Sequence, residues 1–435
     1  MRFNTLEEWL TWLSTLHPRA IDLGLGRVAC VAERLQLLPY SLPVITVAGT
    51  NGKGSCVTLL ESILLAAGYR VGSYFSPHLL RYNERIRSNG HEISDAALCN
   101  IFQKIDSARG KISLTYFEFG TLAALLHFKQ LALDIAVLEV GLGGRLDAVN
   151  IVDASLAIIS TIDMDHMDWL GADRESIAKE KAGILRAERP AICGDLNVPV
   201  TLKQQAERQN SPLYCQGIDF GYHDEGDTWS WWQNKQIWHD LPKPTIQLQN
   251  AATVLTGLQH LSSLFVVTRS AIEQGLKQAY LPGRLQNITV NGISCLLDVA
   301  HNPQSANLLA HYLQTKSIKG RNIVVIGMLA DKDIAASIAP MLSLVDEWYV
   351  AGLDVARGAS TEMLYQVLLS QIDENAIQSP SPMNTSEKGT NKWAIHTCAT
   401  VEDAFQQALT QASAIDRIVV YGSFYTVAKV MLTVA

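Results

Sequence analysis

The chain has 435 residues and a formal net charge of −7, with 48% hydrophobic and 18% charged residues. This balance excludes an intrinsically disordered chain, and the absence of lysine- or arginine-rich runs argues against a nucleic-acid-binding protein. The longest apolar run is about half of the ~20 residues that a membrane-spanning helix needs. Seven scattered cysteines without a Cys-x-x-Cys pair indicate free thiols. Residues 1–19 lack the pattern of a signal peptide, so we expect a cytoplasmic protein.

The first predicted elements are a helix and then a series of strands alternating with helices. Asn4, followed three residues later by Glu7, predicts the N-terminal cap of the helix. From residue 44 the pattern changes to short β-branched or aliphatic runs that read as buried strands, at residues 44–48, 70–75, 134–140 and 156–161. The helical patterns between these runs predict a mostly parallel sheet that is covered on both faces.

A tryptophan-rich segment at residues 222–242 interrupts this alternation. It contains four of the nine tryptophans (229, 231, 232 and 238) around the turn-like Asn234-Lys235. We predict a β-hairpin on which the rings pack against the protein. The alternative is an aromatic platform for a ligand.

A second α/β series follows the break at Leu281-Pro282-Gly283-Arg284. Its predicted strands are residues 294–299, 322–326, 347–351, 393–397 and 417–421. Residues 373–392 are rich in Ser, Pro, Asn and Thr, which predicts a solvated loop or insertion. We therefore expect an N-terminal domain over residues 1–283, a hinge near 283–290, and a smaller C-terminal α/β domain over residues 284–435.

The strongest functional motif is the segment Val44-Ile-Thr-Val-Ala-Gly-Thr-Asn-Gly-Lys-Gly-Ser55. An apolar strand runs into a glycine-rich turn and then into a helix, so backbone amides and the helix N-terminus can contact phosphate oxygens. Lys53 supplies a full positive charge for the outer phosphates. The spacing differs from G-x-x-x-x-G-K-[ST], because two residues separate Gly49 from Gly52. The alternative is a tight strand–helix connection with a solvated lysine.

A second glycine-rich segment, Gly141-Leu-Gly-Gly-Arg-Leu-Asp147, partly matches a dinucleotide-binding fingerprint. Leu146 stands where the third glycine of that fingerprint belongs, and no clear helix pattern follows. Hydride-transfer chemistry is therefore weakly supported.

Three polar residues follow the ends of predicted strands. They are Ser76, Glu139 and His166, and the carboxyl ends of parallel strands gather at the sheet edge where such folds bind ligands. A carboxylate in a buried strand needs compensation, which Mg²⁺ beside a triphosphate would provide. An ion pair is the alternative for Glu139, and a structural role is the alternative for His166 because Mg²⁺ prefers oxygen ligands.

Taken in order along the chain, the motifs resemble those of the bacterial dihydrofolate synthase/folylpolyglutamate synthases, which are relatives of the Mur ligases. The matching segments cover nearly the whole chain: Asp22-Leu-Gly-Leu25, Gly49 to Ser55, Ser76-Pro-His-Leu, Thr115-Tyr-Phe-Glu118, Glu139 to Asp147, Asp165-His166, Glu180-Lys-Ala-Gly183, Leu297 to Pro303, Gly327 to Asp333 and Gly422-Ser-Phe424. The resemblance implies a P-loop-type domain, a Rossmann-like domain, and ATP-dependent joining of L-glutamate to 7,8-dihydropteroate or a reduced folate through an acyl phosphate.

The resemblance also implies roles for individual residues. Contacts to ATP are implied for Thr50, Asn51, Gly52, Lys53, Asn250, Arg284 and Asp298. Pteroate binding is implied for Asp22, Leu23, Gly24, Leu25, Thr115, Tyr116, Phe117, Glu118, Leu146, Asp147 and Ala148. Mg²⁺ ligands, for two ions, are implied at Ser76, Glu139 and His166. Catalytic roles are implied for Lys53, Lys181, Asp147 and His301.

Lys181 carries the most specific implication of the resemblance. Sequence alone favours an exposed lysine or an ion-pair partner of Glu180. The matching lysine of the relatives is carbamylated by CO₂, which would replace a cation by an anionic oxygen ligand for Mg²⁺. For Asp331, as for His301, the resemblance implies a second-domain contact to phosphate or glutamate, with a structural role as the alternative. Tyr425 stands where relatives often carry histidine, so it receives no role.

Two other functions stay open at this point. A Mur ligase that builds peptidoglycan would use the same chemistry, but it usually has a whole domain before the phosphate loop and Ser or Thr in place of Gly54. A non-catalytic nucleotide-gated binding module would need neither a pteroate pocket nor Asp298 and His301. We expect a monomer whose partners are small molecules, with no nucleic acid or membrane among them.

Overall fold

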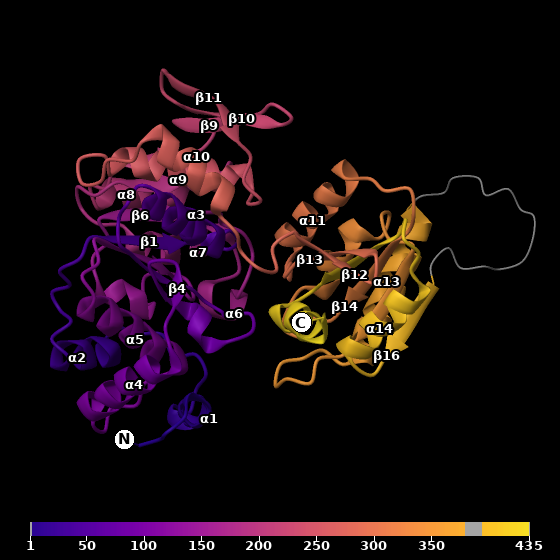
Figure 1. Ribbon diagram of the computed structural model, residues 1–435, viewed down its shortest axis with the longest axis horizontal. Helices are drawn as coiled ribbons and strands as arrows, with labels where there is room; N and C mark the ends of the chain where they lie inside the picture. The colour runs from indigo at the N-terminus through magenta and orange to yellow at the C-terminus, as the bar shows by residue number, and fades with distance from the viewer. Residues whose placement is uncertain (1, 379–393, 435) are drawn as a thin grey trace, which may run out of the picture. The chain divides into compact units, whose positions relative to one another are not determined.

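The computed structural model describes residues 2–378 and 394–434, apart from the side chains of residues 374–378. The chain divides into two compact units, Met1–Leu281 and Pro282–Ala435. Each unit contains a mostly parallel β-sheet with helices packed against it (Figure 1). The predicted fold class, a mostly parallel N-terminal sheet followed by a second α/β domain, is confirmed.

The first unit is built on an eight-stranded sheet in the order β4-β3-β2-β5-β1-β6-β7-β8. Six strands are parallel: β1 (Val44–Ala48), β2 (Val71–Tyr74), β5 (Ile135–Glu139), β6 (Leu156–Ile159), β7 (Ala191–Cys193) and β8 (Leu213–Cys215). The edge strands β3 (Ile86–Ser88) and β4 (His91–Glu92) are antiparallel. All four strands predicted for this part of the chain are present, whereas β3, β4, β7 and β8 were not predicted.

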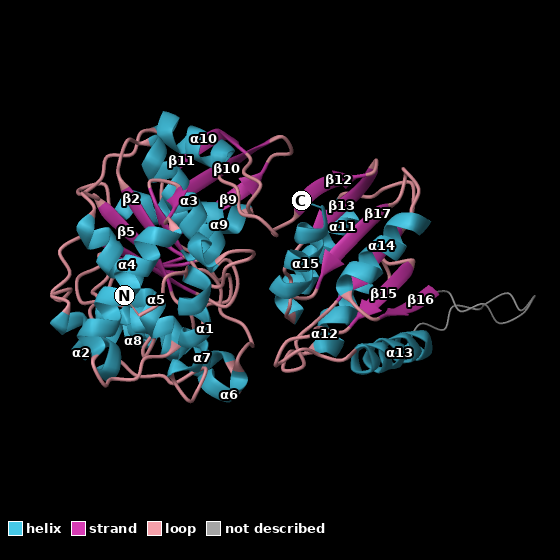
Figure 2. Cartoon of the chain, turned by 60° about the horizontal axis from the view of Figure 1, so that its bottom comes forward, coloured by secondary structure: helices cyan, strands magenta, loops and turns pink. Residues whose placement is uncertain are grey.

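The central strand β1 shows how the sheet separates two cores. Val44 and Ala48 face one core, and Ile45 and Val47 face the other. The first core is covered by α1 (Leu6–Leu16), α2 (Gly26–Arg34), α4 (Asp95–Arg109), α5 (Tyr116–Gln130), α7 (Arg174–Lys181) and α8 (Val200–Arg208). The second is covered by α3 (Lys53–Ala66), α9 (Leu248–His260) and α10 (Arg269–Gln278) (Figure 2). A strand buried on both faces must be apolar throughout, as β1 is.

The N-terminal cap of α1 lies one residue later than predicted. The Thr5 hydroxyl accepts a hydrogen bond from the Glu8 backbone N–H, and the Glu8 carboxylate accepts from the Asn4 and Thr5 backbone N–H groups. Threonine three residues before glutamate is a capping box, so this pair takes precedence over Asn4 with Glu7. The shift buries Trp9 and Leu13 in the first core.

The tryptophan-rich segment forms three strands, so the two-stranded prediction was incomplete. The strands β9 (Phe220–Asp224), β10 (Thr228–Gln233) and β11 (Gln236–Pro242) form an antiparallel sheet, with the predicted turn at Asn234. Trp229 and Trp231 are fully buried in the second core. Their indole N–H groups donate to the Pro242 carbonyl at 3.0 Å and the Thr256 hydroxyl at 3.1 Å. These two rings therefore serve packing, as the hairpin interpretation expected.

The second unit has a six-stranded sheet in the order β12-β13-β17-β14-β15-β16. Its strands are β12 (Gln286–Val290), β13 (Ile293–Leu297), β14 (Asn322–Ile326), β15 (Glu347–Ala351), β16 (Ala394–Cys398) and β17 (Arg417–Tyr421). All are parallel to their neighbours except β12, which pairs antiparallel with β13. The packed helices are α11 (Pro303–Thr315), α12 (Ile334–Ile338), α13 (Thr361–Gln378), α14 (Val401–Gln411) and α15 (Phe424–Val434).

Two sequence interpretations in this unit require correction. Residues 286–290, most of the expected hinge, form strand β12. Residues 373–378, the start of the expected loop, continue helix α13, and residues 379–392 of that prediction lie outside the described residues. The first segment pairs with the strand that follows it, β13, and the second continues the hydrogen-bonded helix that precedes it.

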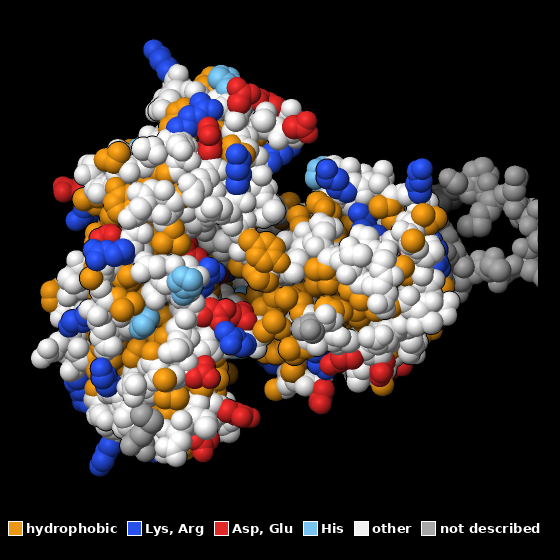
Figure 3. Space-filling model, in the orientation of Figure 1, with side chains coloured by type: hydrophobic (Ala, Val, Ile, Leu, Met, Phe, Trp, Pro, Cys, Tyr) orange, Lys and Arg blue, Asp and Glu red, His pale blue; other side chains and the backbone are white. Residues whose placement is uncertain are grey.

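Within the described ranges, no helix has the length and apolarity required to cross a membrane. On the face shown in Figure 3, lysine and arginine side chains are interspersed with aspartate and glutamate.

Candidate active site

The turn between β1 and α3 is shaped by two glycines. Gly52 has a φ of +84°, a left-handed conformation that favours glycine. A Cβ at Gly52 would lie 2.5 Å from the Asn250 side-chain oxygen, and a Cβ at Gly49 would lie 1.9 Å from the Ser160 hydroxyl. Larger residues would therefore clash at both positions, and the backbone of the turn can approach a phosphate group closely.

The same turn is attached to the end of the neighbouring strand β6. The Thr50 backbone N–H donates to the Thr161 carbonyl at 2.8 Å, and the Asn51 N–H donates to the Thr161 hydroxyl at 3.0 Å. The Thr50 hydroxyl donates to the Asp163 carbonyl at 3.0 Å. Because these bonds join the turn to a buried strand, its conformation is held before any ligand binds.

Lys53 is the first residue of α3. Its Nζ donates to the carbonyls of Gly49 and Thr50, both at 3.0 Å, so the ammonium lies over the turn. Asn250, in the first turn of α9, is buried and lies against Gly52. The structure thus brings five of the predicted nucleotide-binding residues, at positions 50–53 and 250, into one place.

Two of the three predicted metal ligands are adjacent. Glu139 is the last residue of β5, and Ser76 follows β2, the next strand of the sheet. The Ser76 backbone N–H donates to Glu139 Oε2 at 3.0 Å. A Cβ on Gly54 would lie 3.6 Å from the same oxygen, so the carboxylate faces the first turn of α3. The carboxyl ends of β5 and β2 therefore place Glu139 and Ser76 beside the phosphate loop.

His166 precedes the short helix α6 (Met167–Leu170) and has a left-handed φ of +52°. Its backbone N–H donates to Asp165 Oδ1 at 2.9 Å, and its Nε2 lies 3.9 Å from Asp165 Oδ2. Among the described residues, no group of three or more His, Cys, Asp or Glu side chains could hold a metal. The donor set still fits Mg²⁺, because this ion commonly uses one or two carboxylates and completes its shell with phosphate oxygens and water.

Lys181, at the end of α7, is only 2% exposed. The expectation from sequence alone that this lysine is exposed or pairs with Glu180 was wrong, because Glu180 pairs instead with Arg145 at 2.9 Å. Burial lowers the pKa of Lys181 to about 7; the positive charge of Lys53 lowers it further, and Asp165 opposes the shift. The structure thus holds a buried lysine near Lys53 whose pKa is lowered far below that of an ordinary lysine.

Asp147 organises the second glycine-rich segment. Its two carboxylate oxygens accept from the backbone N–H groups of Leu142 at 2.8 Å and Val149 at 3.0 Å. Burial raises the pKa of Asp147 to about 7, opposed by these amides and by Lys53. Only a short 3₁₀ helix, Ala148–Ile151, follows, which agrees with the weak match to a dinucleotide-binding fingerprint.

Replacing Asp147 with asparagine is expected to destabilise the first unit by about 1–3 kcal/mol, because one amide N–H must then face a backbone donor. Urea denaturation measures the change. Asp153→Asn is the matched control, since the Asp153 side chain is exposed. Equal stability of the two variants would show that the contacts of Asp147 are not important for folding.

The three predicted pteroate-binding segments also converge. The Gly24 N–H donates to the Leu146 carbonyl at 3.3 Å. Arg27 joins the segment of Asp22 to the segment of Glu118, because its guanidinium lies 2.6 Å from Asp22 and 3.1 Å from Glu118. No role for Arg27 was predicted from the sequence, and the only indication was its position two residues after Leu25.

The predicted residues of the second unit cluster within that unit. Asp298 accepts from the Leu285 and Ala300 backbone N–H groups, each at 2.8 Å. Burial raises the pKa of Asp298, and the nearby Arg284 opposes this shift. Arg284 lies over the Phe424 ring, 4.9 Å from its centroid, and the ring of His301 lies 6.0 Å from the same ring.

Asp331 and Tyr425 are the two other residues of this unit that the sequence analysis considered. Asp331 pairs with Arg357 at 3.2 Å. Tyr425 is 48% exposed.

Both units of the chain match domains of known protein families. The Mur ligase middle domain matches residues 47–237, and the glutamate ligase domain of the Mur ligases matches residues 283–424. The chain is 46% identical over 426 residues to the Escherichia coli dihydrofolate synthase/folylpolyglutamate synthase, covering 98% of this chain and 94% of the relative. The chain belongs to the dihydrofolate synthase/folylpolyglutamate synthase family. The Haemophilus influenzae member is 42% identical, with coverages of 98% and 96%.

Solved structures of the family agree in fold. The E. coli protein FolC in complex with DHPP and ADP has a TM-score of 0.90 at 45% identity and covers 99% of this chain and 97% of its own. The Yersinia pestis bifunctional synthase complexed with AMPPNP and a manganese ion has a TM-score of 0.89 at 45% identity, with coverages of 99% and 98%.

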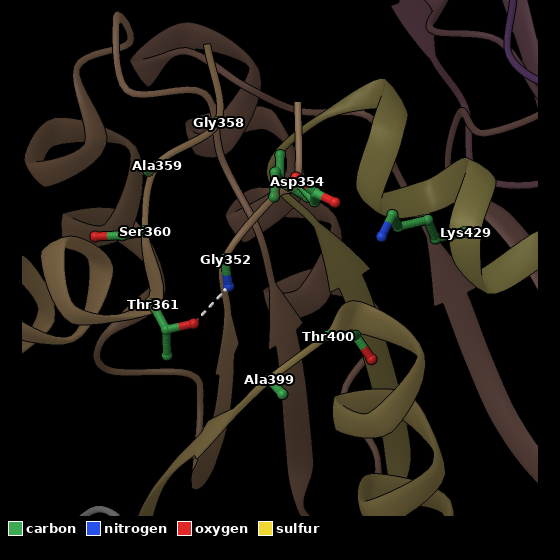
Figure 4. A pocket seen from close by; sticks show the side chains of 10 residues that line it. Gly352, Asp354, Gly358, Ala359, Ser360, Thr361, Ala399, Thr400 and Lys429 are labelled. Atoms are coloured by element: carbon green, nitrogen blue, oxygen red, sulfur yellow. Dashed lines mark hydrogen bonds between the residues drawn. The ribbon is translucent and has the colours of Figure 1, made fainter. Parts of the chain in front are cut away.

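A hollow of about 320 Å³ in the second unit is separate from the residues assigned by family resemblance. It lies after strands β15 and β16, and Lys429 borders it (Figure 4). The Thr361 hydroxyl at its wall accepts from the Gly352 N–H at 2.8 Å and donates to the Cys398 carbonyl. None of the predicted site residues lines this hollow.

Proposed function

We propose that this chain is an ATP-dependent ligase that joins L-glutamate to 7,8-dihydropteroate, forming dihydrofolate, and adds further glutamates to reduced folates. The observation that carries the proposal is the grouping of the phosphate loop with the Ser76–Glu139 pair at the carboxyl ends of the strands, together with buried Lys181, which interacts with Lys53. The family relatives named dihydrofolate synthase/folylpolyglutamate synthase support the substrate class, as does a related structure that holds manganese, AMPPNP and L-glutamate.

In this proposal the first unit activates the acceptor carboxylate. The backbone amides of residues 50–53 hold the ATP phosphates, and the Lys53 ammonium offsets the charge that develops on the transferred γ-phosphoryl group. A carboxylate is a poor electrophile, so phosphorylation is needed to give it a good leaving group. The amino group of glutamate then forms the amide bond with the carbonyl carbon, and phosphate leaves.

Ser76, Glu139 and His166 are the residues that would hold Mg²⁺, of which we predict two ions. When bound, Mg²⁺ neutralises phosphate charge and orients the γ-phosphoryl group. Glu139 is suited to this role because it is buried at the end of a strand, next to the loop that receives the phosphates.

Carbamylation of Lys181 belongs to the same proposal. The neutral Nζ forms a bond to the carbon of CO₂ and releases one proton, which leaves an anionic carbamate. Burial supports this chemistry because it favours the neutral, nucleophilic amine. The carbamate would place a negative charge close to Lys53, where a bare ammonium would be repelled.

The pH dependence of the free energy of unfolding tests whether the pKa of Lys181 is lowered in the folded chain. The lysine has a pKa of about 7 in the folded chain and about 10.4 when unfolded, so between these values the unfolded chain binds more protons. In CO₂-free buffer, the free energy of unfolding of the wild type relative to Lys181→Ala should therefore rise from pH 7 to pH 9, by up to about 1.4 kcal/mol per pH unit. A pH-independent difference would contradict the depressed pKa.

Pteroate binding is assigned to the three convergent segments that include Asp22, Thr115 to Glu118 and Leu146 to Ala148. Arg27 and Asp147 connect these segments to each other and to the region of Lys53. Contacts of Arg284 and Asp298 with ATP, and a catalytic role for His301, are proposed for the second unit. A cytoplasmic monomer without nucleic-acid or membrane partners completes the proposal.

Phosphate release tests the proposal. The purified chain should release phosphate from ATP rapidly only when dihydropteroate and glutamate are both present. A non-catalytic nucleotide-binding module would show no such dependence, and a peptidoglycan ligase would respond to a nucleotide-sugar acceptor in place of dihydropteroate.

A further inference from the structure

Arg85 is a buried cation beside the candidate active site that no role above explains. It ends the 3₁₀ turn Tyr82–Arg85 and is only 9% exposed. Its backbone carbonyl accepts from the Phe75 N–H at 2.8 Å, which ties the turn to the residue before Ser76. The side chain is therefore held next to the strand end that carries a proposed metal ligand.

The groups around the Arg85 guanidinium are aromatic or neutral. It lies 5.5 Å from the ring centroids of both Tyr82 and Tyr116. Its Nε–H donates to His78 Nδ1 at 2.8 Å, and the Tyr74 side chain also interacts with it. In the part of the chain that the structure describes, no carboxylate forms an ion pair with Arg85.

The charged residues next to Arg85 in the sequence do have partners of opposite charge or backbone donors. Arg87, two residues later, pairs with buried Glu61 at 3.0 Å. Glu84, immediately before Arg85, directs its oxygens to the backbone N–H groups of Leu79, Leu80 and Arg81. The nearest carboxylate in sequence is therefore already used, whereas the partly buried Arg87 has an acid as its partner.

A buried charge without a partner of opposite sign costs folding free energy. Aromatic ring faces offset part of that cost but do not neutralise the charge. A guanidinium presents five N–H donors in a fork that matches a carboxylate. An anionic ligand is the group that would complete this environment.

We infer that Arg85 binds a carboxylate of one of the two acids that the ligase joins. The inference rests on the proposed function and adds a residue that recognises the substrates. Tyr116, whose ring lies 5.5 Å from the guanidinium, belongs to a proposed pteroate-binding segment. The Arg85 backbone is bonded to Phe75, the residue before Ser76. A substrate carboxylate held there lies on the path between the pteroate site and the phosphate loop.

Steady-state kinetics of Arg85→Gln tests the inference and identifies the acid. If the acceptor carboxylate binds Arg85, the KM for dihydropteroate should rise roughly ten- to hundredfold, as expected for the loss of a charge-assisted hydrogen bond, while the KM for ATP stays unchanged. If glutamate binds there, its KM should rise instead. Arg81→Gln is the control, because Arg81 is exposed and pairs with Glu92.

Equilibrium binding gives a second readout. The wild type should bind dihydropteroate more tightly than its carboxamide, and Arg85→Gln should lose this preference if the acceptor acid is the ligand. Arg85→Lys keeps the charge without the fork, so its KM should lie between those of the wild type and Arg85→Gln. Unchanged KM values for both acids, or a rise in the KM for ATP alone, would overturn the inference. Failure of the wild type to make dihydrofolate would instead overturn the proposed function.

Thermal unfolding separates a ligand-binding role from a structural one. Arg85→Gln should melt at or above the wild-type temperature, because it removes an unpaired buried charge. Arg87→Gln leaves Glu61 buried without its partner, so it should melt lower by on the order of 5 °C. A fall of that size in Arg85→Gln would assign Arg85 to the structure of the turn and overturn the inference.

Discussion

Replacing Lys181 with alanine is expected to remove most ligase activity while ATP binding and folding persist. The lysine is buried beside Lys53 and has a pKa lowered to about 7, so its neutral amine can take up CO₂. Alanine would delete the proposed carbamate and its negative charge, which the proposed metal site needs. A small added carboxylate, such as acetate, should restore part of the activity by supplying anionic oxygens in the vacated space.

Two measurements distinguish carbamylation from simple burial of a lysine. Carbon NMR of the protein equilibrated with labelled bicarbonate should show a carbamate signal in the wild type and none in Lys181→Ala. Lys179→Ala is the matched control, since Lys179 lies on the same helix but is exposed. No carbamate signal, together with an active Lys181→Ala variant, would leave the buried lysine without a catalytic role.

Replacing Lys53 with alanine is expected to lower ATP-dependent turnover by roughly 10²–10³-fold, as for the loss of one electrostatic stabiliser of a transition state. Its ammonium donates to the carbonyls of Gly49 and Thr50 in its own turn, so the fold should change little. Steady-state turnover and thermal unfolding measured on the same preparation test both parts of this prediction.

Lys277→Ala is a suitable control, because Lys277 is an exposed lysine in the last turn of α10. Its turnover should match that of the wild type. If Lys53→Ala also turns over at nearly the wild-type rate, the phosphate-loop assignment is wrong.

The sequence predicted the buried strands well because their apolar pattern is local. Strands β1, β14, β15 and β17 have the predicted boundaries. Strand β12 was missed because it is an edge strand, Gln286–Val290, in which partly buried and exposed residues alternate. Strands β7 and β8 have three residues each, too few to show a period. They are strands because β7 pairs with β6 and β8 pairs with β7.

The phosphate loop could be predicted for the same reason: strand, glycines, lysine and helix follow one another within twelve residues. The environment of Lys181 could not, because its pKa is set by its burial in the folded chain and by the charges of Lys53 and Asp165, which are distant in the sequence or belong to another loop. Arg27 and Arg85 were missed for a related reason. Their importance depends on which acids pair with them. Only the folded chain shows that Arg27 pairs with Asp22 and Glu118, and that no carboxylate among the described residues forms an ion pair with Arg85.

The central claim is that ATP activates a substrate carboxylate by phosphorylating it. Dihydropteroate labelled with ¹⁸O in its carboxylate, incubated with the chain, ATP and glutamate, tests this most directly. Attack of the carboxylate on the γ-phosphorus followed by amide formation transfers one labelled oxygen to phosphate, so mass spectrometry should find one ¹⁸O in each phosphate released with dihydrofolate. Dihydrofolate formed together with unlabelled phosphate would contradict the acyl-phosphate mechanism.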